Sequence, residues 1–368
     1  MNEWTLMSLA DVITLQRGHD LPATQRGDGT VPVIGSFGIT GTHDFARYTG
    51  PGVAIGRSGA SIGVATYCPS DYWPLNTCLF VKDFRGNDAR WVYYLLYSID
   101  FSGFNSGSAQ PSLNRNYLAN IPVLVPPIAE QRGIAATLGA LDDKIESNRR
   151  VVAGALALAR SHVDRATAGR SVAKYTSALE VCMGSAFKGG AFSDPGSGRP
   201  LLRIRDLKTF ESQTWTTEVR RDETVIQPGD IVVGMDAEFR ATLWLGRESV
   251  LNQRVCSFRG QPGVGRAFVI TSIEPELAFQ EQAKTGTTVI HLNKADIDSF
   301  VVPDLTALEH HKLALETEPL IDFAVARAIE SGVLAATRDT LLPELLSGRI
   351  RVLEAREAVV EAVVEAVG

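Results

Sequence analysis

The sequence predicts an α+β protein in which two β-rich domains follow one another as a tandem pseudo-twofold repeat. Three observations lead to this expectation. The second half of the chain repeats the first, each copy begins with short apolar runs between Gly, Pro and Asp, and each copy ends with helical spacing of its apolar residues. A repeat that spans half of the chain is too long for a solenoid unit. We therefore expect each copy to be a domain followed by a long spacer helix, with the two helices paired antiparallel.

The repeat is clearest where residues 107–143 align with residues 286–322 without a gap, at an offset of 179. Eight of these 37 positions are identical, compared with roughly two or three expected by chance at ordinary composition. The identical pairs are Gly107/Gly286, Leu113/Leu292, Asn114/Asn293, Val123/Val302, Glu130/Glu309, Ala135/Ala314, Leu141/Leu320 and Asp143/Asp322. Upstream, Pro51-Gly52 corresponds to Pro228-Gly229 and Leu75-Asn76 to Leu251-Asn252. Two similar domains suggest a partner that is itself nearly twofold, and duplex DNA is the commonest such partner.

Composition places the chain among soluble globular proteins of two or three domains. It has 368 residues, of which 45% are hydrophobic and 21% charged. The first residues, MNEW, lack the basic start of a secretion signal, and no apolar run approaches the roughly 18 residues of a membrane span, so we expect neither. Cys68, Cys78, Cys182 and Cys256 form no CxxC pair and have no nearby His at metal spacing. Reduced core thiols are the expected interpretation, which favours a cytoplasmic protein.

The charge is unevenly distributed. The net charge is −6, which by itself argues against binding to nucleic acid. Positions 1–266, however, contain 28 Lys and Arg against 25 Asp and Glu, whereas positions 267–368 contain 8 against 17. A DNA site outside the acidic end is therefore compatible with the sequence, but its electrostatic attraction would be weak and would require a more basic partner.

Residues 1–127 are expected to form the first β-rich domain. Short apolar runs at 53–55 and 77–81 lie between turn residues, as in a small curved sheet. One helix is expected over residues 87–98, because Asn87-Asp88 can cap its free N–H groups. Residues 121–127, IPVLVPP, are expected to form an extended closing strand, since their prolines exclude a helix.

Residues 128–170 are expected to form a central helical spacer. Alternating steps of four and three separate its inward positions, which is the spacing of a seam between two packed helices. These positions are Ile134, Leu138, Leu141, Ile145, Asn148, Val152, Ala155 and Ala159. Asn148 on this seam would set the register of the pair. The alternative is that each helix only covers the sheet of its own domain.

The second copy is expected to contain the same parts. Residues 171–303 form the second β-rich domain, and residues 304–352 form the distal helical spacer. The seam residues of this spacer are Leu313, Leu320 and Ala324. Pro319 is expected in the first turn of a helix that restarts there and runs to about Leu342. Residues 353–368 are an acidic C-terminal tail with a glutamate at every fourth position, expected to be a frayed helix or a subunit contact.

Several segments resemble the specificity subunits of type I restriction-modification systems. Residues 110–115 read QPSLNR, residues 121–127 read IPVLVPP, and residues 130–149 read EQRGIAATLGALDDKIESNR. In that family a strand ending in Pro-Pro precedes a Glu-Gln-Arg helix start and a long spacer helix. Trp4, with Leu9 and Gly18, resembles the opening of the first target-recognition domain, and LLPELLSGRI at 341–350 resembles the end of the second spacer helix.

The second copy departs from this family pattern. It has VPD at 302–304 where the first copy ends in PP at 126–127, and EHH at 309–311 in place of EQR at 130–132. The resemblance thus implies the same architecture in both copies, with inexact symmetry between them.

The resemblance implies a non-catalytic subunit without a cofactor. Such a subunit binds a bipartite site on double-stranded DNA, with one half for each target-recognition domain, 1–127 and 171–303. It implies two methyltransferase subunits and motor-driven restriction subunits as partners, and no membrane. The alternatives are a solitary duplicated DNA-binding protein and, from a different class, a tandem β module that binds protein or carbohydrate.

The sequence lacks motifs for catalysis. It has no Asn-Pro-Pro-aromatic or Asp-Pro-Pro-aromatic tetrapeptide for amino-methyl transfer and no GxxxxGKS/T loop for ATP. Residues 56–63, GRSGASIG, are interpreted as a turn or DNA-facing loop rather than a phosphate cradle. Asp304, Glu309 and Lys312 resemble a metal-dependent nuclease motif, but their spacing is wrong and the repeat places Glu309 at a helix start. We expect no catalytic residue and no metal ligand.

Candidate DNA contacts follow the short strands in both copies, because Arg, Asn, Gln, Asp and Glu side chains recognise base edges. In the first domain the candidates are Arg57, Ser58, Ser108, Gln110 and Ser112. In the second domain they are Asp236, Glu238, Arg240, Thr287 and Thr288. Arg115 and Lys294 correspond across the repeat and suit a phosphate contact or a salt bridge equally well.

Overall fold

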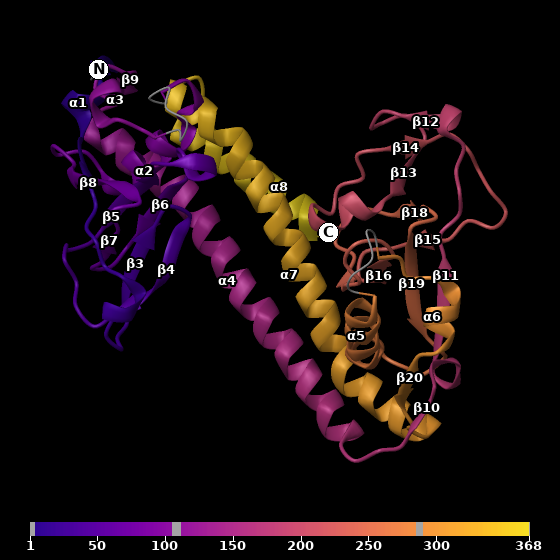
Figure 1. Ribbon diagram of the computed structural model, residues 1–368. Helices are drawn as coiled ribbons and strands as arrows, with labels where there is room; N and C mark the ends of the chain where they lie inside the picture. Colours follow the sequence, from indigo (N-terminus) through magenta and orange to yellow (C-terminus); the bar gives the residue numbers. More distant parts are fainter. Residues whose placement is uncertain (1–3, 105–111, 285–289, 368) are drawn as a thin grey trace. The chain divides into compact units, whose positions relative to one another are not determined.

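The computed structural model describes residues 4–104, 112–284 and 290–367 (Figure 1). Its contacts divide the chain into two compact units. The first unit consists of Met1–Lys144 and Val333–Gly368, and the second of Ile145–Gly332. Each unit therefore contains one β-rich domain and a part of both long helices.

The β-rich domain of the first unit is built from three small sheets. Its strands are β1 (Thr5–Ser8), β2 (Thr14–Arg17), β3 (Val31–Gly35), β4 (Gly38–His43), β5 (Gly52–Gly56), β6 (Ala65–Cys68), β7 (Trp73–Pro74), β8 (Cys78–Asp83) and β9 (Pro122–Val125). The main sheet has the antiparallel order β2-β8-β5-β6, the second sheet has the order β4-β3-β7, and β1 pairs with β9. Strand β5 is buried along its whole length, as its apolar sequence predicts.

Short helices complete this domain. They are α1 (Leu9–Val12), α2 (Ala89–Ser98) and α3 (Arg115–Leu118). Helix α2 begins where predicted, because the Asp88 carboxylate accepts hydrogen bonds from the backbone N–H groups of Arg90 and Trp91. Its apolar face buries Trp91 and Leu96 against the main sheet and the start of the long helix that follows.

The β-rich domain of the second unit has the same plan. Its strands are β10 (Val172–Lys174), β11 (Leu179–Met183), β12 (Phe192–Ser193), β13 (Arg199–Leu202), β14 (Trp215–Thr216), β15 (Val225–Ile226), β16 (Ile231–Gly234), β17 (Ala241–Leu243), β18 (Ser249–Leu251), β19 (Val255–Gly260) and β20 (Val301–Pro303). Its helices are α5 (Arg266–Ala283) and α6 (Lys294–Asp298). The main sheet has the antiparallel order β11-β19-β16-β17, which repeats β2-β8-β5-β6, and β10 pairs with β20 as β1 pairs with β9. The predicted α+β tandem repeat is confirmed.

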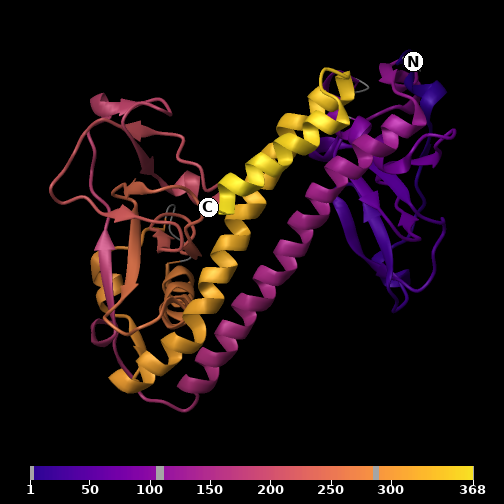
Figure 2. The ribbon, with the colours of Figure 1, turned by 180° about the vertical axis from the view of Figure 1, so that it is seen from behind.

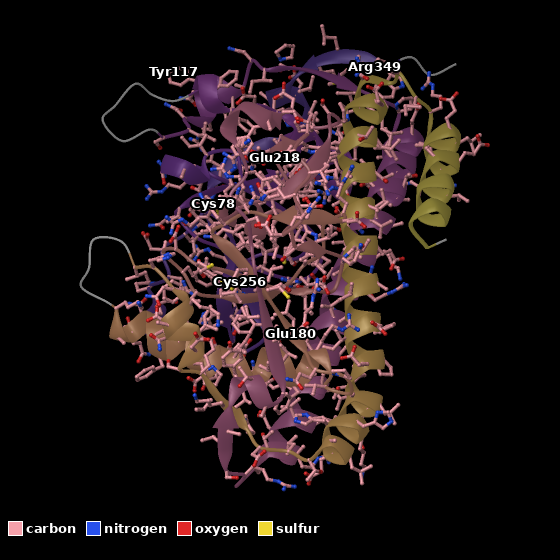
Figure 3. The ribbon with its side chains drawn as sticks, turned by 90° about the vertical axis from the view of Figure 1, so that its right-hand side faces the viewer. Cys78, Tyr117, Glu180, Glu218, Cys256 and Arg349 are labelled. Carbon is pink, nitrogen blue, oxygen red and sulfur yellow. The ribbon has the colours of Figure 1, made fainter. Side chains whose placement is uncertain are left out.

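Two glycines show how closely the main sheets agree. The N–H of Gly18 donates to the Cys78 carbonyl, and the N–H of Gly184 donates to the Val255 carbonyl. A Cβ atom would lie 2.1 Å from the Leu75 oxygen if built on Gly18, and 2.0 Å from the Asn252 oxygen if built on Gly184. Figure 3 labels Cys78 at the start of β8 and Cys256 in β19.

These contacts correct one detail of the sequence alignment. Leu75 corresponds to Asn252, whereas the matching dipeptides had paired Leu75-Asn76 with Leu251-Asn252. The sequence alignment of this turn was wrong by one residue. The conserved feature of the turn is its backbone hydrogen bonds, and these do not depend on the Leu and Asn side chains that the alignment matched.

Helices α4 (Ile128–Thr167) and α7 (Ala307–Ser347) pair antiparallel, as predicted (Figure 1; Figure 2 shows them from behind). In the second unit, the Asn148 side-chain amide donates to the Glu330 carboxylate at 2.9 Å, and His162 Nδ1 lies 2.9 Å from the Glu316 carboxylate. A later residue of α4 therefore contacts an earlier residue of α7, as in an antiparallel pair. Asn148 is 2% exposed, so its hydrogen bond supports the predicted role in register.

The pairing does not exclude the alternative interpretation, because the helices also cover the domains. In the first unit, Ile134 and Leu138 of α4 lie in the same core as Leu341 and Leu345 of α7 and the apolar residues of the main sheet. Coverage and pairing therefore occur together, and each unit has one core shared by sheet and helices.

The prediction that a helix restarts at Pro319 is wrong. Helix α7 runs from Ala307 to Ser347 without a break. The missing N–H of Pro319 would have donated to the carbonyl of Leu315, one turn earlier. Both residues are exposed, so water can satisfy this carbonyl and the helix continues through the proline.

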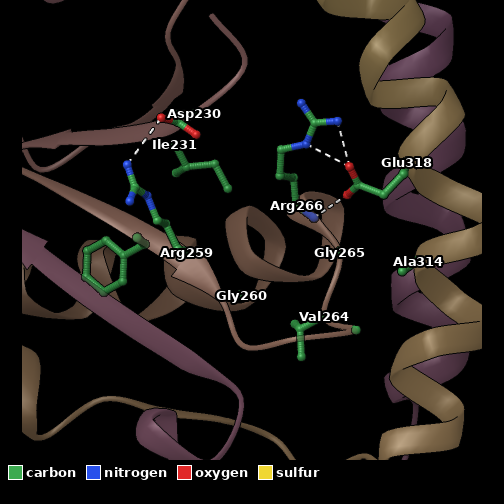
Figure 4. A pocket seen from close by; sticks show the side chains of 11 residues that line it. Asp230, Ile231, Arg259, Gly260, Val264, Gly265, Arg266, Ala314 and Glu318 are labelled. Carbon is green, nitrogen blue, oxygen red and sulfur yellow. Dashed lines mark hydrogen bonds and ion pairs between the residues drawn. The ribbon is translucent and has the colours of Figure 1, made fainter. Parts of the chain in front are cut away.

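Matching ion pairs attach each domain to a long helix. In the first unit, the guanidinium of Arg90, at the start of α2, contacts both Asp143 oxygens at 3.0 and 2.7 Å. In the second unit, the Nε of Arg266, at the start of α5, donates to Glu318 at 2.7 Å (Figure 4). Arg266 also contacts Asp322. Asp143 and Asp322 are one of the identical pairs of the repeat. The structure thus gives this identity a physical reason.

The C-terminal segment is a packed helix, which corrects the expectation of a frayed tail. Helix α8 (Val352–Val367) places Ala355 at 0% exposure in the core of the first unit, and Val352 lies against the face of Gly133 in α4. Arg351 also pairs with Glu130 at 2.5 Å. The segment is apolar on one side, and burial of this side in the core of the first unit stabilises the helix. No helix among the described residues has the length and apolarity needed to cross a membrane.

Candidate nucleic-acid interface

One edge of the main sheet gathers most of the candidate side chains of the first domain. Strands β2 and β5 end at this edge, and β8 begins there, because neighbouring strands are antiparallel. We call the group formed by Arg17, Arg57, Ser58, Asn76 and Ser112 the first edge. Backbone atoms hold it together, since Arg57 N–H donates to the Thr77 carbonyl and the Leu113 N–H donates to the Arg57 carbonyl at 2.7 Å.

Three of the predicted residues meet at the first edge. Ser58 and Ser112 form a β-bridge, and Arg57 Nη2 donates to the Ser112 hydroxyl at 3.3 Å. Arg57 Nη1 lies 3.5 Å from the Asn76 carbonyl oxygen. The guanidinium of Arg57 is therefore held by neutral acceptors alone among the described residues. No carboxylate among those residues pairs with this partly exposed side chain.

Sequence reasoning missed Arg17. It is the last residue of β2, is exposed, and its Nε donates to the same Asn76 carbonyl at 3.4 Å. The only sequence signal is that Arg17 immediately precedes Gly18. The close approach of Gly18 to Leu75 places the end of β2 beside the start of β8, and this approach is visible only in three dimensions.

The corresponding edge of the second domain has the same backbone but different side chains. Strand pairing matches Arg17 to Met183 and Arg57 to Met235. The Leu292 N–H donates to the Met235 carbonyl at 2.8 Å, as the Leu113 N–H does to Arg57. We call the group formed by Met183, Met235, Asp236, Arg254 and His291 the second edge.

At the second edge, an aspartate, a histidine and an arginine side chain contact one another. Asp236 and His291 form a β-bridge, and Asp236 Oδ1 lies 2.6 Å from His291 Nδ1. Arg254 Nη1 lies 3.6 Å from the same Asp236 oxygen. Asp236 was a predicted site residue, whereas His291 and Arg254 were not. His291 aligns with Ser112, so the repeat itself was the signal that could have found it.

Two predicted residues of the second domain lie apart from Asp236. Glu238 is within 3.6 Å of the Lys208 ammonium group, so its charge is partly neutralised. Arg240 is exposed and lines a separate apolar cavity of about 490 Å³ between β17, α5 and the two long helices. The structure therefore does not bring Glu238 or Arg240 into the second edge.

Arg115 and Lys294 occupy corresponding helix starts but differ in their contacts. Lys294 pairs with Asp298, and its ammonium lies 3.3 Å from the Tyr175 hydroxyl. The hydrogen bond from Lys294 lowers the pKa of Asp298. Arg115 is exposed and lines a hollow with Thr14 and Arg85, near the opposite end of the main sheet from Arg17. Lys294 thus forms a salt bridge with Asp298 in this structure.

The remaining predicted contacts are Ser108, Gln110, Thr287 and Thr288. All four lie outside the described residues, and they remain predictions. In the sequence, Ser112 of the first edge is two residues after Gln110, and His291 of the second edge is three residues after Thr288.

The structure explains the glycine-rich segment 56–63 and Glu309 of the nuclease-like pattern without catalysis. Within residues 56–63, the Ser61 hydroxyl donates to the Ser58 carbonyl at 2.6 Å and closes a single 3-10 turn, Gly59–Ser61. Glu309 caps helix α7, where the backbone N–H and the hydroxyl of Thr306 lower the pKa of its carboxyl. Within the described ranges no cluster of three or more His, Cys, Asp or Glu side chains is suited to a metal ion.

Three of the four cysteines, Cys68, Cys78 and Cys256, are buried, and Cys182 is partly exposed. All four are free thiols. Burial raises the pKa of Cys78 and of Cys256 to about 12, so both remain protonated at neutral pH. This agrees with their interpretation as core thiols.

Comparison with known proteins points to one family. Residues 1–153 match the family model of the type I restriction modification DNA specificity domain. The chain is 27% identical over 179 residues to the type I restriction enzyme EcoBI specificity subunit of Escherichia coli, a match that covers 47% of this chain and 38% of that protein. It is 25% identical over 140 residues to the EcoprrI specificity subunit of the same organism, covering 37% and 35% of the two chains. The chain thus spans well under two thirds of the length of either relative.

The fold also occurs in a solved structure. The type I restriction-modification system S subunit from M. genitalium superposes with a TM-score of 0.67 over 94% of this chain and 96% of that chain, at 13% identity. At this identity the likeness concerns the fold alone. Together with the family match, it confirms the resemblance seen in residues 110–149.

Proposed function

We propose that this chain, whose residues 1–153 match the family model of the type I restriction modification DNA specificity domain, is the DNA-recognition and scaffold subunit of a type I restriction-modification complex. Each β-rich domain would read one half of a bipartite site on double-stranded DNA. Two methyltransferase subunits and motor-driven restriction subunits would join it in the cytoplasm. The chain itself would contribute no catalytic residue and no cofactor.

One observation carries this proposal. The same sheet edge recurs in both domains on the same backbone hydrogen bonds, yet its side chains differ completely. A duplicated frame with different polar groups at one place is what two readers of different sequences require.

The chemistry of the two edges suits different contacts. The first edge offers Arg57 and two serine hydroxyls, which are donors toward DNA acceptors. The second edge offers the Asp236 carboxylate, which can accept from the amino group of cytosine, and Arg254, which can donate. The long helices α4 and α7 would serve as the scaffold, because each passes through both units without interruption.

The test is to purify the chain alone and together with a methyltransferase subunit that carries an Asn-Pro-Pro-aromatic motif. We expect the chain alone to transfer no methyl groups and to bind duplex DNA weakly, because the net charge of positions 1–266 is near zero. The complex should bind tightly, with strong salt dependence, and methylation-aware sequencing should reveal a two-part motif. Methyl transfer by the isolated chain, or a motif in one part, would contradict the proposal.

A further inference from the structure

The first edge contains two arginines that converge on one atom. Arg17 Nε and Arg57 Nη1 lie 3.4 and 3.5 Å from the carbonyl oxygen of Asn76. Because both nitrogens lie so close to one oxygen, they are less than about 7 Å from each other. A single neutral carbonyl is a weak counterpart for two guanidinium charges at this separation.

No carboxylate neutralises this pair within the described parts of the chain. Neither arginine has an ion pair there, and the carboxylate of Asp20 is engaged by the side-chain amide of Asn76. The Nε of Arg57 is buried and without a hydrogen-bond partner. This nitrogen is closed to DNA, but each terminal nitrogen of Arg57 has a second hydrogen, so the first edge holds two close positive charges with N–H donors left over.

We propose that Arg17 and Arg57 together bind one backbone phosphate of duplex DNA. This inference rests on the proposed function and deepens it, because it assigns Arg57 to positioning rather than to reading a base. A backbone phosphate has two non-bridging oxygens that share one negative charge, and each guanidinium group can donate to one of them.

A base is a poorer partner for this pair. Recognition of guanine uses two parallel donors of one arginine. The terminal nitrogens of Arg57 already donate to Asn76 and Ser112, and Arg17 of β2 donates to the same Asn76 carbonyl. A shared anion satisfies both side chains without breaking these contacts.

The second domain has no equivalent of this pair. Met183 and Met235 occupy the two matching positions, and Met235 is 3% exposed. Their thioethers bear no charge. The Arg17–Arg57 pair would therefore make the salt dependence of DNA binding larger at the half-site of the first domain.

The test uses the chain in complex with its methyltransferase subunit, with Arg17→Gln, Arg57→Gln and the double variant. Each single change should weaken binding roughly tenfold, equally for the recognised duplex and for unrelated DNA. The slope of log K against log salt should fall by about one in the double variant, because one phosphate is lost and not two. The methylated motif should stay unchanged.

The matched control is Arg85→Asn. Arg85 follows β8 at the end of the sheet opposite Arg17 and donates to the Thr14 hydroxyl, and Asn tolerates its positive φ of 49°. This variant removes the same charge and should keep the wild-type slope. Arg17→Lys and Arg57→Lys, which retain the charge, should recover most of the slope and show that the glutamine variants act through charge rather than unfolding.

Three outcomes would overturn the proposal. A motif that changes at one base in either glutamine variant would make that arginine a base reader. An unchanged salt slope in the double variant would exclude the shared phosphate. If the wild-type complex still binds duplex DNA in that case, the proposed function is unaffected. A wild-type complex that binds no duplex would overturn both.

Discussion

The first and second edges stand at the same place on the same fold, yet their chemistry is almost opposite. The first edge has Arg17 and Arg57 held by neutral oxygens, whereas the second has two methionines beside an Asp236–His291–Arg254 group. The backbone hydrogen bonds beneath them have nearly the same length where Leu113 and Leu292 close the edge, at 2.7 and 2.8 Å. The comparison teaches that the duplication kept the frame and exchanged the side chains it displays.

The largest effect is expected from the glycines that make the two frames alike. Gly18→Ala and Gly184→Ala would each push a methyl group to 2.1 and 2.0 Å, respectively, from a backbone oxygen. We expect each to lower the free energy of unfolding by about 3 kcal/mol, since backbone must move. Urea denaturation measures the loss, and hydrogen exchange should locate it in the main sheet of the altered domain.

Gly103→Ala and Gly190→Ala are the matched controls. Neither glycine has a positive φ, and a Cβ atom on either would meet no atom of the described residues within 4 Å. Both variants should unfold like the wild type. If Gly18→Ala were harmless while Gly184→Ala was not, the two frames would not be equivalent.

A smaller effect is expected where each domain is attached to a long helix. Arg90→Gln removes both contacts to Asp143, and Arg266→Gln removes the contacts to Glu318 and Asp322. Because these pairs are partly exposed, we expect losses of roughly 1–2 kcal/mol in each case. The exposed Arg132→Gln on α4 serves as the control.

The identity of Asp143 and Asp322 in the repeat makes this test informative. Similar losses for Arg90→Gln and Arg266→Gln would show that the two attachments are equivalent. A loss confined to one of them would mean that the shared aspartate is no longer used alike in both copies.

The smallest effect concerns a position where the copies differ. Buried Gln131 in the first unit accepts from the Asp88 N–H and donates to Asn87 and Pro126. Its counterpart His310 is 7% exposed, packs edge-on against Phe268, and has an Nδ1 without a partner. Burial lowers the pKa of His310, although the nearby Glu309 and Asp304 oppose this shift.

The sign of the pH effect follows from this lowered pKa. The unfolded chain binds a proton at this histidine near pH 6.5, but the folded chain resists it, so stability should fall as the pH drops below about 6.5. His310→Gln should remove up to about 1 kcal/mol of that decline between pH 7 and 5.5. Urea denaturation at both pH values measures it. An identical decline in the variant would show that other groups cause it.

The sequence predicted the fold better than the site. The repeat of apolar spacing and the prolines at 121–127 were enough to predict the tandem domains and the paired helices, because these patterns depend on local periodicity. The continuous path of α7 through Pro319 could not be predicted, since it depends on the solvent exposure of the Leu315 carbonyl. The packing of α8 likewise depends on a core formed by distant segments.

The sequence placed a candidate residue at one of the two edges mainly where that residue follows a strand. Arg57, Ser58 and Asp236 follow the buried strands β5 and β16, and the structure brings them to an edge together with Ser112, which precedes α3. Arg17, Arg254 and His291 reach the same edges through strand pairing, which a single sequence does not reveal. Arg240 follows a strand as well, but the turn after Asp236 directs it to another cavity.

The most direct test of independent readers is an exchange of one domain. Residues 1–127 would be replaced by the corresponding domain of a related specificity subunit, and the DNA methylated by the resulting complex would be sequenced. If each edge reads its own half-site, one half of the motif should change and the other half should remain as in the wild type. A change in both halves, or in neither, with the complex still active, would contradict the account.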